Sequence, residues 1–166
     1  NKITNITTTS EDYEATGIIK SGAANASTIY NNRIANINAP NSTRPLGVRG
    51  MYMEGLVNVY HNTVYLNCTT GGSGFGSSCI FSSTDEVQVM RNNVLYNALT
   101  KGDVKALTRS TGNLSTYNAS SNYNLYYAGV PSATNLIYAS HDNTHQVQTL
   151  SAFRTLLADN RDLNSY

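Results

Sequence analysis

The feature that most constrains the fold is an internal repeat of 30 residues. In residues 57–67 (VNVYHNTVYLN), two short runs of alternating apolar and polar residues meet at a polar bend at His61 and Asn62. Alternation with a period of two is typical of β-strands. The same pattern surrounds Asn32 and Asn92, which lie 30 residues to either side of Asn62. Repeats of this length without amphipathic helices predict a β-solenoid, in which each coil stacks on the previous one.

The repeat also predicts a ladder of asparagine side chains. Equivalent residues of adjacent coils would lie about 4.8 Å apart, so their amides could hydrogen-bond from coil to coil, each bond contributing about 1 kcal/mol. The alternative is that Asn is simply common in this chain, but the flanking apolar residues repeat together with it, which favours a ladder. Spacing alone leaves Asn122 and Asn124 open at the fourth position, and we assign Asn124. The predicted ladder is therefore Asn32, Asn62, Asn92 and Asn124.

Three motifs in succession, HNTVYL, RNNVLYN and NYNLYYAG, resemble the right-handed parallel β-helix superfamily with the pectate-lyase-like fold. They are most similar to secreted and cell-surface β-helix proteins of Bacteroidetes-type bacteria. Residues 149–153 and 161–165 are similar to a segment that follows these repeats in that group, although Phe153 stands where Trp is frequent. The resemblance covers about residues 27–165. It implies an all-β, right-handed parallel β-helix of about four coils that belongs to a longer secreted chain.

We expect three segments along the chain. Residues 1–26 would form a partial N-terminal coil, residues 27–140 the β-helix coils, and residues 141–166 a C-terminal cap. In the last segment, apolar residues recur at helical spacing from Leu150 to Leu157. A short helix there would cover the end of the solenoid, which otherwise exposes unpaired strands. An ordinary surface helix is the alternative.

The composition excludes several classes of partner. Only 13% of the residues are charged and the net charge is +1, so the basic patch typical of nucleic-acid binding is not indicated. No apolar run approaches the roughly 20 residues of a membrane-spanning helix, so we expect no membrane insertion. Together with the resemblance, the abundance of Asn, Ser and Thr predicts an extracellular or cell-surface location. We expect no cofactor.

Cys68 and Cys79 flank a loop rich in Gly and Ser. A disulfide between them would close roughly a dozen residues and stabilise the fold by about 3 kcal/mol. Two free thiols within a stacked core are the alternative. Two cysteines do not supply the four ligands of a structural zinc site, so no metal site is predicted from them.

No catalytic constellation is recognisable in the sequence. The three histidines are scattered, and no strand carries the two or three carboxylates that calcium coordination prefers. Lyases of the superfamily that the chain resembles use acidic residues for calcium and an Arg or Lys as base. The charged residues that could fill those roles are Arg49, Asp85, Glu86, Arg91, Asp103, Lys105 and Arg109. The sequence favours a non-catalytic protein, with a fragment of a polysaccharide lyase or glycoside hydrolase, active elsewhere in its chain, as the alternative.

A binding surface is suggested by the tyrosines, of which there are 12, with no Trp. Strand alternation places Tyr30, Tyr60 and Met90 in one outward column, with Tyr65 extending the surface beyond the bend. Tyr beside Asn suits stacking on sugar rings and hydrogen bonding to their hydroxyls, whereas the alternative is that these rings pack on one another. We therefore expect an adhesin or stalk segment of a larger bacterial protein, with polysaccharide as its candidate ligand.

Overall fold

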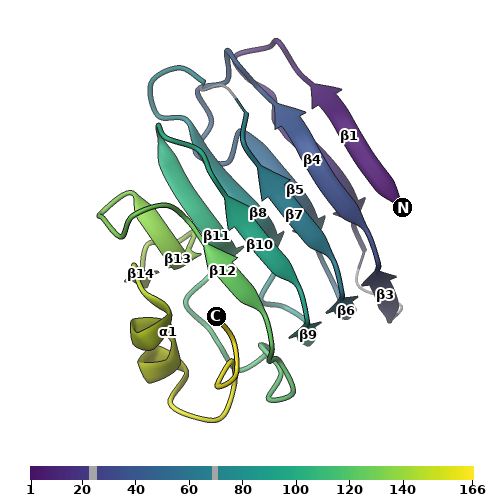
Figure 1. Cartoon of the computed structure of the whole chain (residues 1–166), viewed down its shortest axis with the longest axis vertical. Coiled ribbons are helices and arrows are strands. Elements are labelled where there is room, and N and C mark those ends of the chain that lie inside the picture. The colour runs from purple at the N-terminus through teal and green to yellow at the C-terminus, as the bar shows by residue number, and fades with distance from the viewer. Residues whose placement is uncertain (23–25, 69–70) are drawn as a thin grey trace.

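The computed structural model describes residues 1–22, 26–68 and 71–166. The chain winds into a parallel β-solenoid of about four turns, in which three sheets run along the length of the molecule and share one core (Figure 1). Strands that are adjacent in a sheet come from consecutive coils and pair in parallel, except that Gln146–Val147 pairs antiparallel with Asn135–Ser140. The prediction of an all-β parallel solenoid with one short C-terminal helix is confirmed.

The first three coils each contribute a strand to each of the three sheets, which are named here A, B and C, and the later coils contribute strands to sheets A and B. Sheet A contains β1 (Lys2–Thr7), β4 (Arg33–Asn38), β7 (Thr63–Leu66), β10 (Val94–Asn97) and β12 (Leu125–Tyr127). Sheet B contains β2 (Ala15–Lys20), β5 (Val48–Met53), β8 (Gly76–Ser82), β11 (Asp103–Arg109), β13 (Asn135–Ser140) and β14 (Gln146–Val147). Sheet C contains β3 (Ser27–Tyr30), β6 (Val57–Tyr60) and β9 (Gln88–Arg91).

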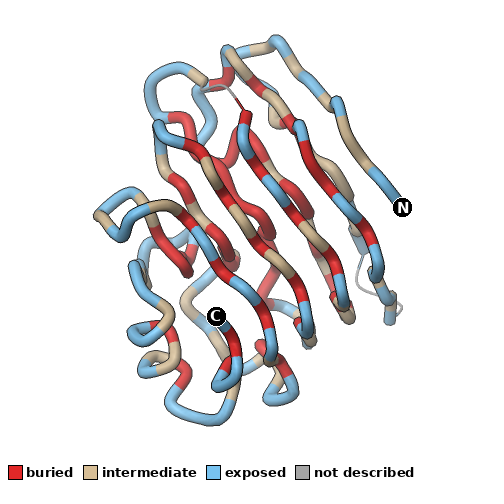
Figure 2. Tube along the Cα trace, in the orientation of Figure 1, coloured by how far each residue is buried: buried red, intermediate tan, exposed pale blue. Residues whose placement is uncertain are grey.

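The core consists of columns of apolar side chains that stack from coil to coil. In sheet A, Ile34, Val64 and Leu95 are in register and are fully buried. Figure 2 shows this alternation of buried and accessible residues along the strands of the central coils. Because burying one such side chain contributes roughly 1.5–3 kcal/mol, each coil is stabilised mainly by its two neighbours.

Sheets A and B approach each other closely at Gly50. A Cβ atom on Gly50 would lie 2.2 Å from Val64 Cγ1 and 2.5 Å from the carbonyl oxygen of Cys79. Only glycine fits at this contact, which lets the inner faces of the two sheets interdigitate.

A bend with left-handed backbone precedes the sheet A strand in four successive coils, before β4, β7, β10 and β12. The residues at the bend have positive φ angles of 55°, 54°, 56° and 59°; they are Asn31, His61, Asn92 and Tyr123. Asn and His adopt this conformation more readily than most residues do. The residue that follows each bend points its side chain into the molecule, and these residues form the asparagine ladder described below.

The first coil of the solenoid consists of strands, whereas a helix covers the last coil. The first 26 residues contribute β1 and β2, and β3 completes that coil, so the first coil has a strand in all three sheets. At the other end, α1 (Leu150–Leu157) begins after Thr149, whose Oγ1 accepts a hydrogen bond from the main-chain N–H of Ala152 at 3.2 Å. Phe153 of this helix is fully buried and stacks on Tyr138 with ring centroids 4.8 Å apart. The helix therefore lies against the last coil, as a cap does.

Candidate functional site

The asparagine ladder runs through the corner between sheets C and A. Asn32 Nδ2 donates to Asn62 Oδ1 at 2.9 Å, and Asn62 Nδ2 donates to Asn93 Oδ1 at 3.1 Å. Asn93 Nδ2 then donates to Asn124 Oδ1 at 3.0 Å. The third member is thus Asn93, and the prediction of Asn92 is wrong. The coil after Asn62 is 31 residues long, so a strict period of 30 falls one residue short, on the bend.

The ladder has a direction, because every bond between two ladder amides runs from Nδ2 of one coil to Oδ1 of the next coil toward the C-terminal end. From Asn62 onward the acceptor oxygen takes two hydrogen bonds from the preceding coil: Asn62 Oδ1 accepts from the main-chain N–H of Asn32 at 3.1 Å and from its Nδ2 at 2.9 Å. Asn62, Asn93 and Asn124 are almost completely buried. Amides that hydrogen-bond in a chain within a low-dielectric interior polarise one another, so the ladder acts as one structural unit.

A buried carboxylate ends the ladder. Asn124 Nδ2 donates to Asp162 Oδ1 at 3.0 Å, and Tyr126 Oη and Ser165 Oγ donate to the same oxygen at 3.0 and 2.6 Å. Tyr117 Oη donates to the other carboxylate oxygen. Burial, together with the negative charge of Asp162, raises the pKa of Tyr117 and Tyr126 well above the usual range. Both phenols therefore keep their protons and remain donors. These contacts are structural and leave no group free to react.

The predicted tyrosine column lies on the outside of sheet C, but its third member is wrong. Tyr30 is in register with Tyr60, and Tyr60 is in register with Arg91. Met90 pairs with Val59 and is buried in the core. The one-residue difference in coil length reverses the strand face assigned from spacing, because side chains alternate with a period of two. The outward column is therefore aromatic in two coils and cationic in the third.

Tyr65 lies in a different sheet and belongs to a column of stacked rings. Its ring centroid is 5.6 Å from that of Tyr96, and Tyr96 is 4.2 Å from Tyr127. The rings of Tyr96 and Tyr127 are stacked, and the ring of Tyr65 is tilted by 39° relative to that of Tyr96. This arrangement favours packing between coils over stacking on a sugar for Tyr65.

The predicted disulfide between Cys68 and Cys79 is wrong, because both are free and buried thiols. Cys79 lies in β8 of sheet B, whereas Cys68 follows β7 of sheet A. Burial raises the pKa of Cys68 to about 11 and that of Cys79 well above its usual range. The thiolate is the reactive form of cysteine, so both side chains behave as small apolar residues of the core.

A row of aromatic and cationic side chains lies on the outer face of sheet B. Tyr52 and Phe81 are in register, with parallel rings whose centroids are 5.3 Å apart. The guanidinium carbon of Arg49 lies 4.8 Å from the Tyr52 centroid, and His141 meets Phe81 edge-on at 6.0 Å. Four side chains from three coils therefore contact one another in a row, in which the ring of Phe81 is largely buried.

Three of these side chains, Arg49, Phe81 and His141, line a groove made of two hollows that share Glu14 and Arg49. Each has a volume of about 330 Å³. The first is also lined by Arg44, Phe81 and His141, and the second extends toward β1 and β2. Each volume falls within the range of small-molecule sites. The residues that line the two hollows come from several coils.

Arg49 is the central polar group of the groove. Its Nε donates to Thr16 Oγ1 at 3.1 Å, and its Nη2 lies 3.8 Å from Glu14 Oε2. Burial lowers the pKa of the Arg49 guanidinium and Glu14 opposes that shift, so the side chain stays a cation. The terminal nitrogens make no hydrogen bond within the part of the chain that the structure describes. Arg49 therefore holds a fixed position and offers donors to a ligand.

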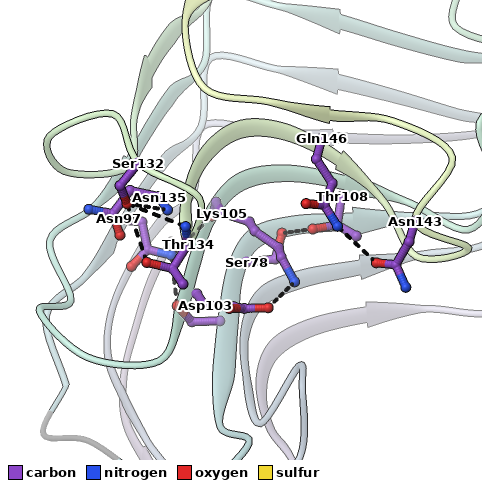
Figure 3. A network of polar contacts seen from close by, with 11 residues as sticks. Ser78, Asn97, Asp103, Lys105, Thr108, Ser132, Thr134, Asn135, Asn143 and Gln146 are labelled. Carbon is purple, nitrogen blue, oxygen red and sulfur yellow. Dashed lines mark hydrogen bonds and ion pairs between the residues drawn. The ribbon is translucent and has the colours of Figure 1, made fainter.

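The other charged residues singled out from the sequence do not converge on the groove. Farther along sheet B, Lys105 pairs with Asp103 at 3.1 Å within a network of polar contacts (Figure 3). Arg109 is buried, and its guanidinium donates to Gln88 and Thr116. Among the described residues, no group of three or more His, Cys, Asp or Glu side chains is placed to hold a metal ion.

Comparisons with protein-family models, curated proteins and solved structures find no match to this chain. Within the described residues, no helix is both long and apolar enough to cross a membrane. The geometry of the groove and of the two solenoid ends therefore carries the functional argument.

Proposed function

We propose that the chain is a non-catalytic β-helix segment of a bacterial secreted or cell-surface protein and that it binds polysaccharide in the groove on sheet B. It would serve as a rigid stalk or adhesive module. The resemblance of its repeats to secreted, pectate-lyase-like β-helix proteins supports the extracellular location. The observation that carries the binding proposal is the position of Arg49, fixed by Thr16 and Glu14 at the centre of the groove.

The chemistry of the groove suits a linear sugar chain. The largely buried ring of Phe81 lines the first hollow, and the Tyr52 ring lies against the guanidinium of Arg49. Sugar residues combine apolar C–H surfaces with hydroxyl groups, and sites that recognise such ligands combine aromatic side chains with a few fixed polar groups. Because the lining residues come from several coils, the groove can contact successive sugar units of one chain. Tyr30, Tyr60 and Tyr65 lie outside the residues that line the groove.

The distribution of carboxylates supports binding without turnover. Glycoside hydrolases usually need two carboxyl groups on either side of the scissile bond. Among the described residues that line the two hollows, Glu14 is the only one with a carboxylate. Its oxygens face Arg44 at 3.4 Å and Arg49 at 3.8 Å.

The test is electrophoresis of the chain through gels that contain soluble polysaccharides, together with analysis for cleavage products. We expect at least one polysaccharide to retard the chain without being cleaved. Arg49→Ala should weaken that binding about 10-fold or more, since a hydrogen bond to a charged group is worth roughly 1.5–3 kcal/mol. Arg33→Ala is the matched control, because it removes the same charge from an exposed position on sheet A.

Three outcomes of this test contradict the proposal. If no polysaccharide retards the chain, the groove is not a polysaccharide site and only the role of a stalk is left. If Arg33→Ala and Arg49→Ala weaken binding equally, the attraction depends on net charge and not on the groove. If cleavage products form, the protein is an enzyme.

A further inference from the structure

The N-terminal end of the solenoid exposes strand edges in all three sheets. β1, β2 and β3 are the first strands of sheets A, B and C, and each pairs on one side only, with β4, β5 and β6 (Figure 1). Their other edges present main-chain donors and acceptors that pair with nothing in the described chain. Open edges of this kind are templates for further strands.

The same end also exposes part of the core. Ile3, Ile18 and Ile29 are only partly buried, and they line a hollow of about 570 Å³. Their counterparts in the next coil, the residues in register with them, are at most 2% exposed; these are Ile34, Met51 and Val59. Figure 2 shows that β1 carries no buried residue, whereas strands of the central coils carry several. The first coil therefore has the inward apolar pattern of a central coil without the burial.

The direction of the ladder defines what fits on this end. Asn1 Nδ2 donates to Asn32 Oδ1 at 3.1 Å, so Asn1 occupies the first ladder position. In the following coils the ladder oxygen accepts from the amide and the main-chain N–H of the preceding coil, as Asn62 does from Asn32. By the same geometry, Asn1 Oδ1 is the acceptor that faces the N-terminal side. A complementary surface must bring donors to that point.

We propose that this N-terminal end is a docking surface for a further solenoid coil whose strands run in the same direction. Such a coil adds one parallel strand to each of β1, β2 and β3. Its apolar side chains cover Ile3, Ile18 and Ile29, and its ladder amide donates to Asn1 Oδ1. This proposal concerns a surface separate from the sheet B groove and does not depend on polysaccharide binding.

A second copy of the chain fits this surface poorly. A two-fold axis at the N-terminal end would set Asn1 Oδ1 against the same acceptor of the other copy, and the strands would meet antiparallel. A head-to-tail arrangement is blocked because α1 and residues 159–166 close the opposite end. The polarity of the ladder thus selects a coil over a dimer.

The proposal can be tested by adding a coil to the intact 166-residue chain. A copy of residues 32–61, placed directly before Asn1, contains the equivalents of β4, β5 and β6 and gives Asn1 the position that Asn62 has in the native chain. A Gly/Ser linker of the same length is the control. A third variant carries the added coil with its ladder residue, copied from Asn32, replaced by Ala.

The added coil should raise the thermal midpoint by at least about 4 °C and slow amide hydrogen exchange in β1, β2 and β3 about 10-fold or more. The Gly/Ser linker should do neither, and the variant with Ala should give a smaller increase. An added coil that behaves like the linker would overturn the proposal. So would concentration-dependent dimerisation of the unextended chain that protects the same three strands, because the occupant would then be a second copy. Neither outcome depends on Arg49, so this test and the binding test can fail separately.

Discussion

The two ends of this solenoid are built from the same repeat, but the C-terminal end is covered by a cap and the N-terminal end is open. At the C-terminal end, Phe153 is fully buried against the last coil and Asp162 accepts the last ladder amide. At the N-terminal end, Ile3 is only partly buried and Asn1 begins the ladder at an exposed position. The difference shows that a coil gains its stability from its neighbours, and that a terminal coil needs either a cap or another coil.

The direction of the ladder explains why the two ends need different hydrogen-bonding groups. The bonds between its amides all run toward the C-terminal end, so the cap there must supply acceptors. Asp162 does so with a carboxylate that also accepts from Tyr126 and Ser165. A cap for the opposite end would have to supply donors, which a further coil of the same direction provides.

The largest expected effect is at the helix cap. Phe153→Ala removes a fully buried ring that packs on Tyr138 and Tyr126, and we expect a loss of about 3–5 kcal/mol in the free energy of unfolding. Ile3→Ala, the matched change at the open end, should cost about 1 kcal/mol because Ile3 is only partly buried. Denaturant unfolding of both variants measures the difference. Equal losses would mean that the ends are equally covered.

The next effect concerns the ends of the ladder. Asp162→Ala removes the carboxylate that accepts from one amide N–H of Asn124 and from the hydroxyl of Tyr126 in the buried interior, which should cost about 3 kcal/mol. Asn1→Ala removes an exposed donor and should cost less than about 0.5 kcal/mol. Thermal and denaturant unfolding would show whether the carboxylate is the dominant end group. A small loss for Asp162→Ala would contradict its role as the acceptor that ends the ladder.

A smaller effect distinguishes the ladder from the bend within one coil. Asn93→Ala should cost about 2 kcal/mol, because Asn62 loses its acceptor and the carbonyl of Val59 loses a donor. Asn92→Gly should stay within about 0.5 kcal/mol, because glycine adopts the positive φ of the bend without strain. The reverse order of these two losses would restore Asn92 to the ladder.

The sequence predicted the solenoid because the repeat and the strand alternation are both local signals. It did not predict the register of the third coil. The spacing of Asn32 and Asn62 predicts a constant coil length of 30 residues, but the next two coils are each 31 residues long. One additional residue exchanges the inner and outer faces, which explains both the assignment of Asn92 for Asn93 and the outward placement of Met90.

The sequence contains no local signal for the groove around Arg49 and only a partial one for Asp162, the carboxylate that ends the ladder. Arg49 was considered only as one of several charged residues, since its neighbours Phe81 and His141 come from coils far along the chain. No local motif brings those three together. Asp162 and Ser165 did lie in a segment that resembles a known motif, but their role depends on meeting Asn124 in space. The predicted disulfide is wrong for a similar reason. Cys68 and Cys79 are close in sequence, but Cys68 follows a strand of sheet A and Cys79 lies in a strand of sheet B.

The most direct test of this account is the exchange rate of the ladder side-chain amide protons, measured by NMR on the intact chain. The account predicts that the amide protons of Asn62, Asn93 and Asn124 exchange at least about 100-fold more slowly than those of Asn92, and that those of Asn1 exchange fastest within the ladder. Protection of Asn92 in place of Asn93 would contradict the ladder itself. Equal protection of Asn1 and Asn124 would contradict the difference between the two ends.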